Sequence, residues 1–379
     1  MKNWKQSTFF GFLTILILII LFVTCEGPQG IQGEQGIQGE QGIQGESGIS
    51  STHNHQWSGW IVLSASTETT DGLETRVCAL DPSHIEMRSI PKIISLSSLT
   101  EYLSDLPEND INTPYNVAMK VNDLTDVASI IINSGKYINL DLSGCGFTSI
   151  EGNAFLNCSK ITSINIPEGV TSIGHQAFMN CSSLSGINIP NGVGSIEDRA
   201  FANCSSLSSI TIPKGVTFIG DMAFSFTNAE AIDVDIANTA YCSDNGVLYN
   251  KAQTTLIQYP RGKTGISFTI PDSVTIIGIS AFAGCNGLSS VTIPNGVSSI
   301  GNSAFFDCGF KNITIPSSVT TIENMAFWCN LNSVTFNGVF TAIDEDNSFL
   351  GGGSLRNIYP SQGAGTYIHT NDNTWVKEL

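Results

Sequence analysis

Charged side chains are scarce in this chain of 379 residues. They make up 13% of it, against about 25% in average soluble domains, so we expect a surface that is polar but largely neutral. Most of the charges are acidic, with 33 Asp and Glu against 16 Lys and Arg and a net charge of −17. Because phosphate groups repel an acidic chain, nucleic acid and anionic membrane surfaces are poor partners for it.

Residues that catalysis uses are also scarce. The chain has five histidines, and none forms a recognisable pair with a nucleophile. Arg261–Thr264 is similar to the end of a phosphate-binding loop, but Ile257 occupies a position where that loop needs glycine. We interpret the acids of 233–235 and 344–346 as solvated side chains rather than calcium ligands. We therefore expect a protein that is not an enzyme and binds no cofactor.

One segment carries residues that could bind a metal. His53, His55, Cys78 and His84 are acceptable zinc ligand types within a short stretch of the chain. Their spacing matches no strong zinc pattern, and exposed histidines are common in small surface modules. The prediction is that no metal is bound, and a zinc- or thiol-dependent activity is the least favoured function.

The longest apolar run near the N-terminus, Phe9–Val23, is too short to span a bilayer comfortably. It follows two lysines, which is typical of an export signal. The run leads into Leu21-Phe22-Val23-Thr24-Cys25, which resembles the signal of a bacterial lipoprotein. The resemblance implies that Cys25 is acylated and that the protein is anchored at the bacterial cell surface or outer membrane. An uncleaved anchor or an ordinary secretory leader is the alternative, and each of these also implies export.

Glycine occupies every third position from Gly27 to Gly48, which gives eight Gly-X-Y triplets. Only glycine fits at the axis of a collagen triple helix, so a strict period of three is a specific signal. The triplets contain a single proline, and eight such triplets are marginally stable unless another domain holds three chains together. Two interpretations stay open: an extended polar stalk, or a collagen-like neck that makes the protein a homotrimer.

A phrase of about 23 residues recurs through the larger part of the chain. Its clearest copy is ITSINIPEGVTSIGHQAFMNC, from Ile161 to Cys181. The I-x-I part predicts a strand, the proline ends that strand, and the Ala-Phe pair fills the interior. Such a period predicts a solenoid in which each repeat is one coil. The phenylalanine of the phrase falls at Phe155, Phe178, Phe201, Phe224, Phe282, Phe305 and Phe327.

The repeat resembles the BspA-like leucine-rich repeat family of bacterial surface proteins. The resemblance implies a right-handed leucine-rich repeat solenoid with about 23 residues per coil. It also implies adhesion to host matrix, host cells or other microbes through a protein or glycan ligand. A structural envelope lipoprotein, with the stalk as a spacer, is the alternative function.

The segments before the repeats differ in composition from one another. Trp57, Trp60 and the turn at Asp71-Gly72 predict a small β-module. The next segment has helical spacing over 96–106 and 124–133, with Asn122 or Asp123 as the cap of the second helix, and a strand over 115–121. The expected fold is thus a β-rich solenoid with an α/β cap. The predicted order is 1–25 signal and lipobox, 26–50 stalk, 51–92 β-module, 93–138 N-terminal cap, 139–350 solenoid and 351–379 C-terminal cap.

Cysteine is plentiful, with ten copies, and most of them occupy one repeat position. Parallel stacking puts the Cβ atoms of neighbouring coils about 4.8 Å apart, which exceeds the roughly 3.5–4.5 Å that a disulfide needs. We therefore expect free thiols in the core. The Asn-Cys-Ser triplets at Asn157, Asn180 and Asn203 match a glycosylation sequence because the repeat does.

Two regions are candidates for contact with a ligand. One is the outward side of the predicted strands, which is a solvated face in the alternative interpretation. The other is a long coil over 229–265, where the phenylalanine spacing widens and a β-hairpin joins 247–249 to 256–259. Its tyrosines favour partner contact, although a structural extension is the alternative interpretation for this coil. The candidate residues are Asn165, Asn188, Thr211, Thr292, Thr314 and Thr335 on the strands and Tyr241, Tyr249 and Tyr259 in the long coil.

Overall fold

The computed structural model describes residues 61–64, 72–77, 85–90, 93–338, 342–343, 363–370 and 374–378. The chain divides into two units, Met1–Lys92 and Ile93–Leu379. The lipobox Cys25, the Gly-X-Y triplets and the zinc candidates His53, His55, Cys78 and His84 lie outside the described residues. In the part of the chain that is described, no helix has the length and apolar character needed to cross a membrane.

The described part of the first unit is an antiparallel sheet. Its strands are β1 (Ile61–Ser64), β2 (Gly72–Val77) and β3 (Ile85–Ile90), in that order across the sheet. Thr75 of β2 pairs with Ile61 on one side and Met87 on the other.

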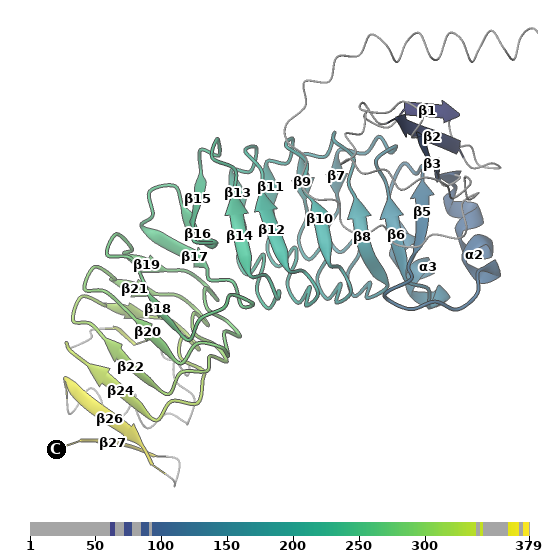
Figure 1. Ribbon diagram of the computed structural model, residues 1–379. Helices are drawn as coiled ribbons and strands as arrows, with labels where there is room; N and C mark the ends of the chain where they lie inside the picture. The colour runs from purple at the N-terminus through teal and green to yellow at the C-terminus, as the bar shows by residue number, and fades with distance from the viewer. Residues whose placement is uncertain are drawn as a thin grey trace, which may run out of the picture. The chain divides into compact units, whose positions relative to one another are not determined.

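The second unit is the predicted β-solenoid, with about 11 turns (Figure 1). Most coils contribute a long and a short strand, whereas a helix follows each of the first two long strands and a hairpin follows the long strand Ala231–Val234. Successive coils pair in parallel register, so that Ile187 lies opposite Ile164. The long strands are β4 (Ile93–Ile94), β5 (Tyr115–Met119), β6 (Ile138–Asp141), β8 (Ile161–Asn165), β10 (Gly186–Asn188), β12 (Ser209–Ile212), β14 (Ala231–Val234), β18 (Ser267–Thr269), β20 (Ser290–Thr292), β22 (Asn312–Ile315) and β24 (Ser333–Phe336). The short strands are β7 (Ser149–Ile150), β9 (Ser172–Ile173), β11 (Ser195–Ile196), β13 (Phe218–Ile219), β19 (Ile276–Ile277), β21 (Ser299–Ile300), β23 (Thr321–Ile322) and β25 (Ala342–Ile343).

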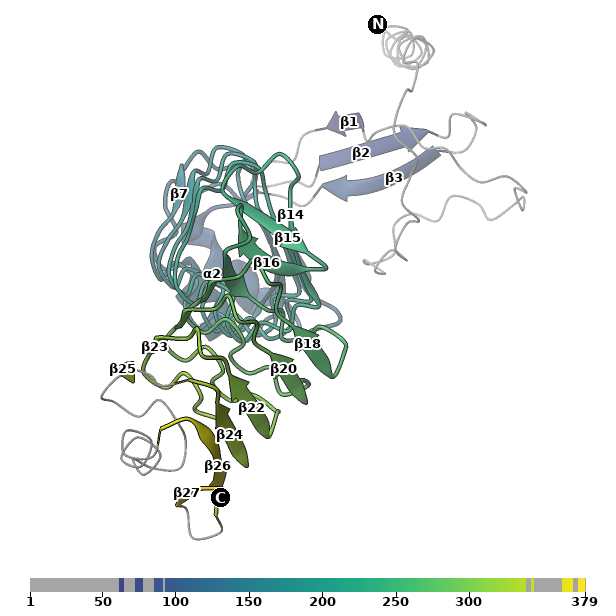
Figure 2. The ribbon, with the colours of Figure 1, turned by 90° about the vertical axis from the view of Figure 1, so that its left-hand side faces the viewer.

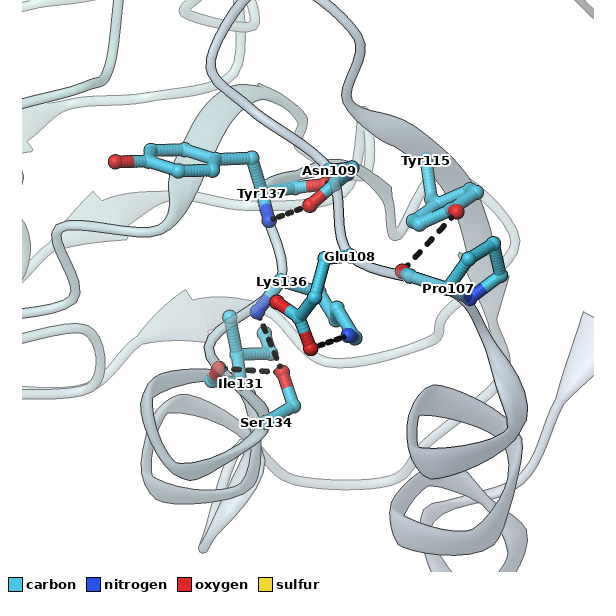
Figure 3. A network of polar contacts seen from close by, with 8 residues as sticks. All are labelled: Pro107, Glu108, Asn109, Tyr115, Ile131, Ser134, Lys136 and Tyr137. Carbon is cyan, nitrogen blue, oxygen red and sulfur yellow. Dashed lines mark hydrogen bonds and ion pairs between the residues drawn. The ribbon is translucent and has the colours of Figure 1, made fainter.

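The N-terminal end of the solenoid is covered by α2 (Leu96–Asp105) and α3 (Val127–Ser134). Both lie where the spacing predicts helices, but α3 begins later than expected. Its N-cap is Asp126, whereas the Asp123 carboxylate accepts the amide of Thr125 at 2.9 Å in a turn before the helix. The loop before β5 is fastened to the start of β6, where Asn109 exchanges hydrogen bonds with the backbone of Tyr137 (Figure 3).

The cap also contains an ion pair between a buried lysine and a glutamate whose side chain is 87% exposed. The side chain of Lys136 is 5% exposed, and its ammonium group pairs with the carboxylate of Glu108 (Figure 3). A buried amine needs such a partner because water does not reach it. At the other end, β26 (Gly365–His369) pairs with β24 and β27 (Trp375–Lys377) pairs with β26, both antiparallel. Tyr367 and Trp375 are buried beneath these strands.

The interior of each coil is filled as the repeat predicts. The Ala-Phe residues are buried apart from the half-buried Ala154, and the phenylalanine rings of neighbouring coils stack. Centroids of Phe178 and Phe201 lie 5.2 Å apart at 4°, and those of Phe305 and Phe327 lie 5.1 Å apart at 14°. Stacked rings at such distances add to the free energy gained from burial.

The glycine of the phrase is needed for space rather than for its backbone conformation. A Cβ on Gly174 would lie 2.6 Å from the nitrogen of Gly152 in the preceding coil, and the φ of Gly174 is not positive. Glu197 replaces glycine in the next coil, and its carboxylate accepts the amide of His175 at 3.1 Å. The left-handed residue of the bend comes two positions later and is rarely glycine, for example Gln176 at φ 54°.

The long coil divides the solenoid into a first stack, the coils from β6 to β14, and a second stack, the coils from β17 to β24 (Figures 1 and 2). It contains the predicted hairpin, with β15 (Tyr241–Asp244), β16 (Val247–Asn250) and β17 (Thr255–Gln258) paired in antiparallel order. Strand β16 stands between two hydrophobic cores. Leu248 belongs to the core of the first stack, and Val247 and Tyr249 belong to the core of the second.

Candidate binding surface

The strand residues predicted to face outward do so. Asn165, Asn188, Thr211, Thr292 and Thr314 are exposed, and Thr335 is half-buried. They fall in one column across the long strands, since Asn188 pairs with Asn165 and Thr335 with Thr314. Two further members were missed by the sequence analysis, Thr269 after the long coil and Thr366 in the C-terminal hairpin.

The face formed by this column is almost free of charge. A second outward column runs beside the first and contains Ser163, Gly186, Ser209, Ser267, Ser290, Asn312 and Ser333. On the described strands from β6 to β24, the charged outward positions are Asp141 and Asp233. Every other outward residue is Ser, Thr, Asn, Gly or Ala. We call this surface the hydroxyl-amide face.

Polar side chains elsewhere on the solenoid are used internally. At one corner, Asn180 donates to the amide oxygen of Asn157 at 2.7 Å, and Asn203 donates to that of Asn180 at 2.9 Å. At the turn before several of the short strands, a hydroxyl donates to a carbonyl of the preceding coil, as Thr171 does to Thr148 at 3.1 Å. These columns join coil to coil, so their hydrogen-bonding groups are already satisfied.

The hydroxyl-amide face is different in this respect. Within the described part of the chain, the side chains of Asn165, Asn188, Thr211, Thr292 and Thr314 make no hydrogen bond to another residue. Both ends of the face are exceptions, because Ser163 donates to Asn139, Ser333 donates to Asn312 and Thr335 bonds to Thr366. The donors and acceptors of the central strands are therefore available to water or to a partner.

The tyrosines of the long coil do not form a contact surface. Tyr249 and Tyr259 are each 2% exposed, so they are closed to a partner. Tyr259 takes the place of the repeat phenylalanine: its ring stacks on Phe282 at 5.3 Å, and its amide donates to Ala281 as the phenylalanines do in other coils. Burial raises the pKa of Tyr259 to about 12 and that of Tyr249 still further.

Tyr241, the third tyrosine, completes the edge of the short-strand sheet. Its hydroxyl accepts the amide of Ile219 at 2.8 Å and lies 3.5 Å from the carbonyl of Thr217. It thus supplies, at the end of β13, the hydrogen bonds that a further strand would make. The long coil is a structural extension that ends one stack and begins the next, and this leaves the hydroxyl-amide face as the candidate site.

The cysteine column is also structural. The thiols are free and buried, as the sequence analysis predicts, and Cys181, Cys204 and Cys308 each donate to a phenylalanine carbonyl at 3.1 Å. Burial raises the pKa of the Cys204 thiol to about 12, so it keeps the proton that it donates. Where Thr227 replaces cysteine, its hydroxyl donates to Phe224 at 2.9 Å. The described residues contain no group of His, Cys, Asp and Glu that could hold a metal ion.

Comparison with known proteins places this architecture in a family. The family described as "BspA type Leucine rich repeat region" matches residues 133–252 and 262–371, which is more than half of the chain. The chain therefore belongs to the BspA-type leucine-rich repeat family. No curated protein sequence gives a significant match to it.

Solved structures share the fold. The pneumococcal vaccine antigen PcpA is 25% identical, with a TM-score of 0.50 over 59% of this chain and 57% of its own. This chain thus spans about 57% of the length of that antigen. A leucine-rich repeat protein from Eubacterium ventriosum is 24% identical, with a TM-score of 0.49 over 78% of this chain and 77% of its own. A leucine-rich cell surface protein from Faecalibacterium prausnitzii is 24% identical, with a TM-score of 0.42 over 64% and 75%.

Proposed function

We propose that this protein is a non-catalytic adhesin that binds a protein or glycan through the hydroxyl-amide face. The observation that carries the proposal is the set of exposed hydroxyl and amide groups on the central long strands that have no partner within the described chain. Other polar columns of the same solenoid are satisfied internally, so the scaffold does not need these groups for its own stability.

The chemistry of the face favours an uncharged polar ligand. Hydroxyl and amide groups each donate and accept hydrogen bonds, and a bond of this kind contributes only about 0.5–1.5 kcal/mol. Affinity must then come from many contacts along an extended surface, which is how solenoids commonly bind their partners. Exposed segments of other proteins and the hydroxyl groups of glycans both meet this requirement.

The N-terminal sequence supports display outside the cell. The lipobox-like sequence at Cys25 supplies an anchor, and the Gly-X-Y triplets of 26–50 supply a spacer between that anchor and the folded units. The pneumococcal relative is described as a vaccine antigen, which is consistent with a place at the surface. Digestion of intact cells with a protease tests this location, and full protection of the chain would contradict it.

Binding is tested with the chain from residue 26 onward, applied to matrix proteins, host cells and partner microbes. Thr292→Lys with Thr314→Lys places two bulky charges on the face, and we expect the affinity to fall at least about tenfold. Asn295→Lys with Ser317→Lys is the matched control, since it adds the same charges to exposed turns of the same coils and leaves the face intact. An equal loss in both variants would show that the added charge, rather than the face, matters.

The structural envelope lipoprotein is the competing function. It predicts no saturable binding to any of these surfaces, together with unchanged adhesion of a strain that lacks the protein. That pair of results would overturn the adhesin proposal.

A further inference from the structure

The three-stranded sheet of the first unit separates apolar from charged positions. Residues directly opposite each other in an antiparallel sheet share a face, and successive residues of a strand alternate between faces. The observed register puts the apolar positions Ile61, Leu73, Val77, Ile85 and Met87 on one face, together with Ser64, Thr75 and Ser89. All the charged positions, Glu74, Arg76, Glu86 and Arg88, belong to the opposite face, together with Val62, Gly72 and Ile90. The face with the charged positions is suited to contact with water, and the face with the larger number of apolar positions is suited to a hydrophobic partner.

Among the described residues, this apolar face is exposed at the edge strand, whereas Thr75 of the central strand is 4% exposed. Ile85 is 54% exposed and Met87 is 59% exposed, and both lie on β3, which is paired on one side by β2. Exposed aliphatic side chains side by side on a sheet edge are costly in water. A module of this size also buries too little surface to be strongly stable by itself. Both properties favour association with another surface.

The sequence just before the sheet indicates what that surface is. The Gly-X-Y triplets end at Gly48, and the short segment 49–60 leads directly into β1. A glycine at every third position serves a triple helix, in which three chains of the same kind wind together. Eight triplets with one proline do not hold three chains by themselves, so an adjacent unit must bring the chains together and align them.

We infer that the apolar face of the β1-β2-β3 sheet joins three copies of this chain and aligns their Gly-X-Y triplets as a collagen-like neck. The inference rests on the proposed stalk. The hydrophobic contact among three sheets supplies the association that the triplets lack, and the triplets fix the number of chains at three. The charged positions of the sheet then stay on the outside of the trimer.

The experiment uses the chain from residue 26 onward, whose mass in solution is measured by light scattering and sedimentation. We expect three times the mass of one chain, together with the circular dichroism of a triple helix that melts cooperatively. Ile85→Lys should convert the trimer to monomer or raise its dissociation concentration at least about tenfold, because a charge would be buried in the contact. Glu86→Lys is the matched control on the neighbouring position of the other face, and it should leave the trimer unchanged.

Further variants separate loss of association from loss of folding. Ile85→Thr with Met87→Thr keeps strand-forming residues and should still weaken the trimer. Gly36→Ala with Gly39→Ala should abolish the triple-helix signal and leave the chains associated through their sheets. A monomeric wild-type chain would overturn the inference, as would a dimer. A trimer that survives Ile85→Lys and is lost on the glycine substitutions would also overturn it, because the triplets would then associate without the sheet.

Failure of this inference is distinct from failure of the proposed function. Binding of one solenoid to its ligand is a property of the hydroxyl-amide face and is measured with the ligand in solution and the protein immobilised at low density. A monomeric chain that binds in this way would overturn the trimer inference and support the adhesin proposal. A trimer that shows no saturable binding would support the trimer inference and overturn the adhesin proposal.

Discussion

The two stacks of the solenoid use the same core and present different surfaces. In the first stack the outward column is mixed, with amides at Asn165 and Asn188, Thr211, and acids at its two ends, Asp141 and Asp233, and an amide ladder runs along one corner. In the second stack the same outward column carries threonines, at Thr269, Thr292 and Thr314. The corner ladder is missing there, since Gly284 and Asp307 take the positions of the ladder asparagines. The core positions are fixed by packing, whereas packing leaves the outward column free to vary.

The largest expected effect comes from breaking one core at a time. Phe201→Ala and Phe305→Ala each remove a buried ring that lies between two others, at a cost of about 3–5 kcal/mol. Because each stack has its own core, we expect each substitution to destabilise mainly its own stack. Hydrogen exchange of the two stacks measures this. Equal loss of protection in both stacks for either variant would show that the solenoid is a single cooperative unit.

High pH should weaken both stacks together. Burial raises the pKa of Cys204 in the first stack, and of Cys285 in the second, to about 12 from an ordinary value of 9.0. A folded state that holds the proton more tightly keeps this stability below the unfolded pKa and loses it as pH rises from about 9 towards 12. Thermal unfolding at pH 8 and pH 10.5 measures this loss of stability. The Cys204→Ser variant should lose less stability between the two pH values than the unchanged protein.

The corner ladder should give a smaller effect that differs between the stacks. Asn180 and Asp307 both have positive φ, at 63° and 53°, so glycine fits either site. Asn180→Gly removes two amide hydrogen bonds and should cost about 1 kcal/mol. Asp307 makes no such bonds within the described chain, so Asp307→Gly should be neutral or stabilising. Chemical denaturation compares the two, and an equal cost would mean that the ladder does not stabilise the first stack.

The sequence predicts the columns of the solenoid well because its period repeats each environment. Most strand, proline, Ala-Phe and cysteine positions have their expected burial, and the predicted outward strand residues are exposed apart from the half-buried Thr335. The tyrosines of the long coil were harder to interpret, because residue type alone favours partner contact for an aromatic residue outside the repeat. A signal was available: Tyr259 precedes Phe282 by the ordinary repeat interval. The match is hard to recognise because Gln258 and Tyr259 stand where the other copies have Ala-Phe, and Pro260 follows them.

Other features depend on contacts that a single sequence does not reveal. Glu197 and Glu323 stand where other copies have glycine, which indicates that the bend needs no positive φ, but only the structure shows that Gly174 makes room for the coil before it. The start of α3 moves to Asp126 because Asp123 is engaged in a separate turn. The asparagines at the corner recur with the repeat, but their mutual hydrogen bonds appear only when the coils are stacked.

The position of strand β16 bears on how local unfolding passes from one stack to the other. Its alternate residues belong to different cores, with Leu248 on one side and Val247 and Tyr249 on the other. The wall between the cores is therefore a folded element of the chain rather than solvent. If a protease or a pulling force unfolds the second stack, β16 still covers the end of the core of the first stack, so the first stack can stay folded.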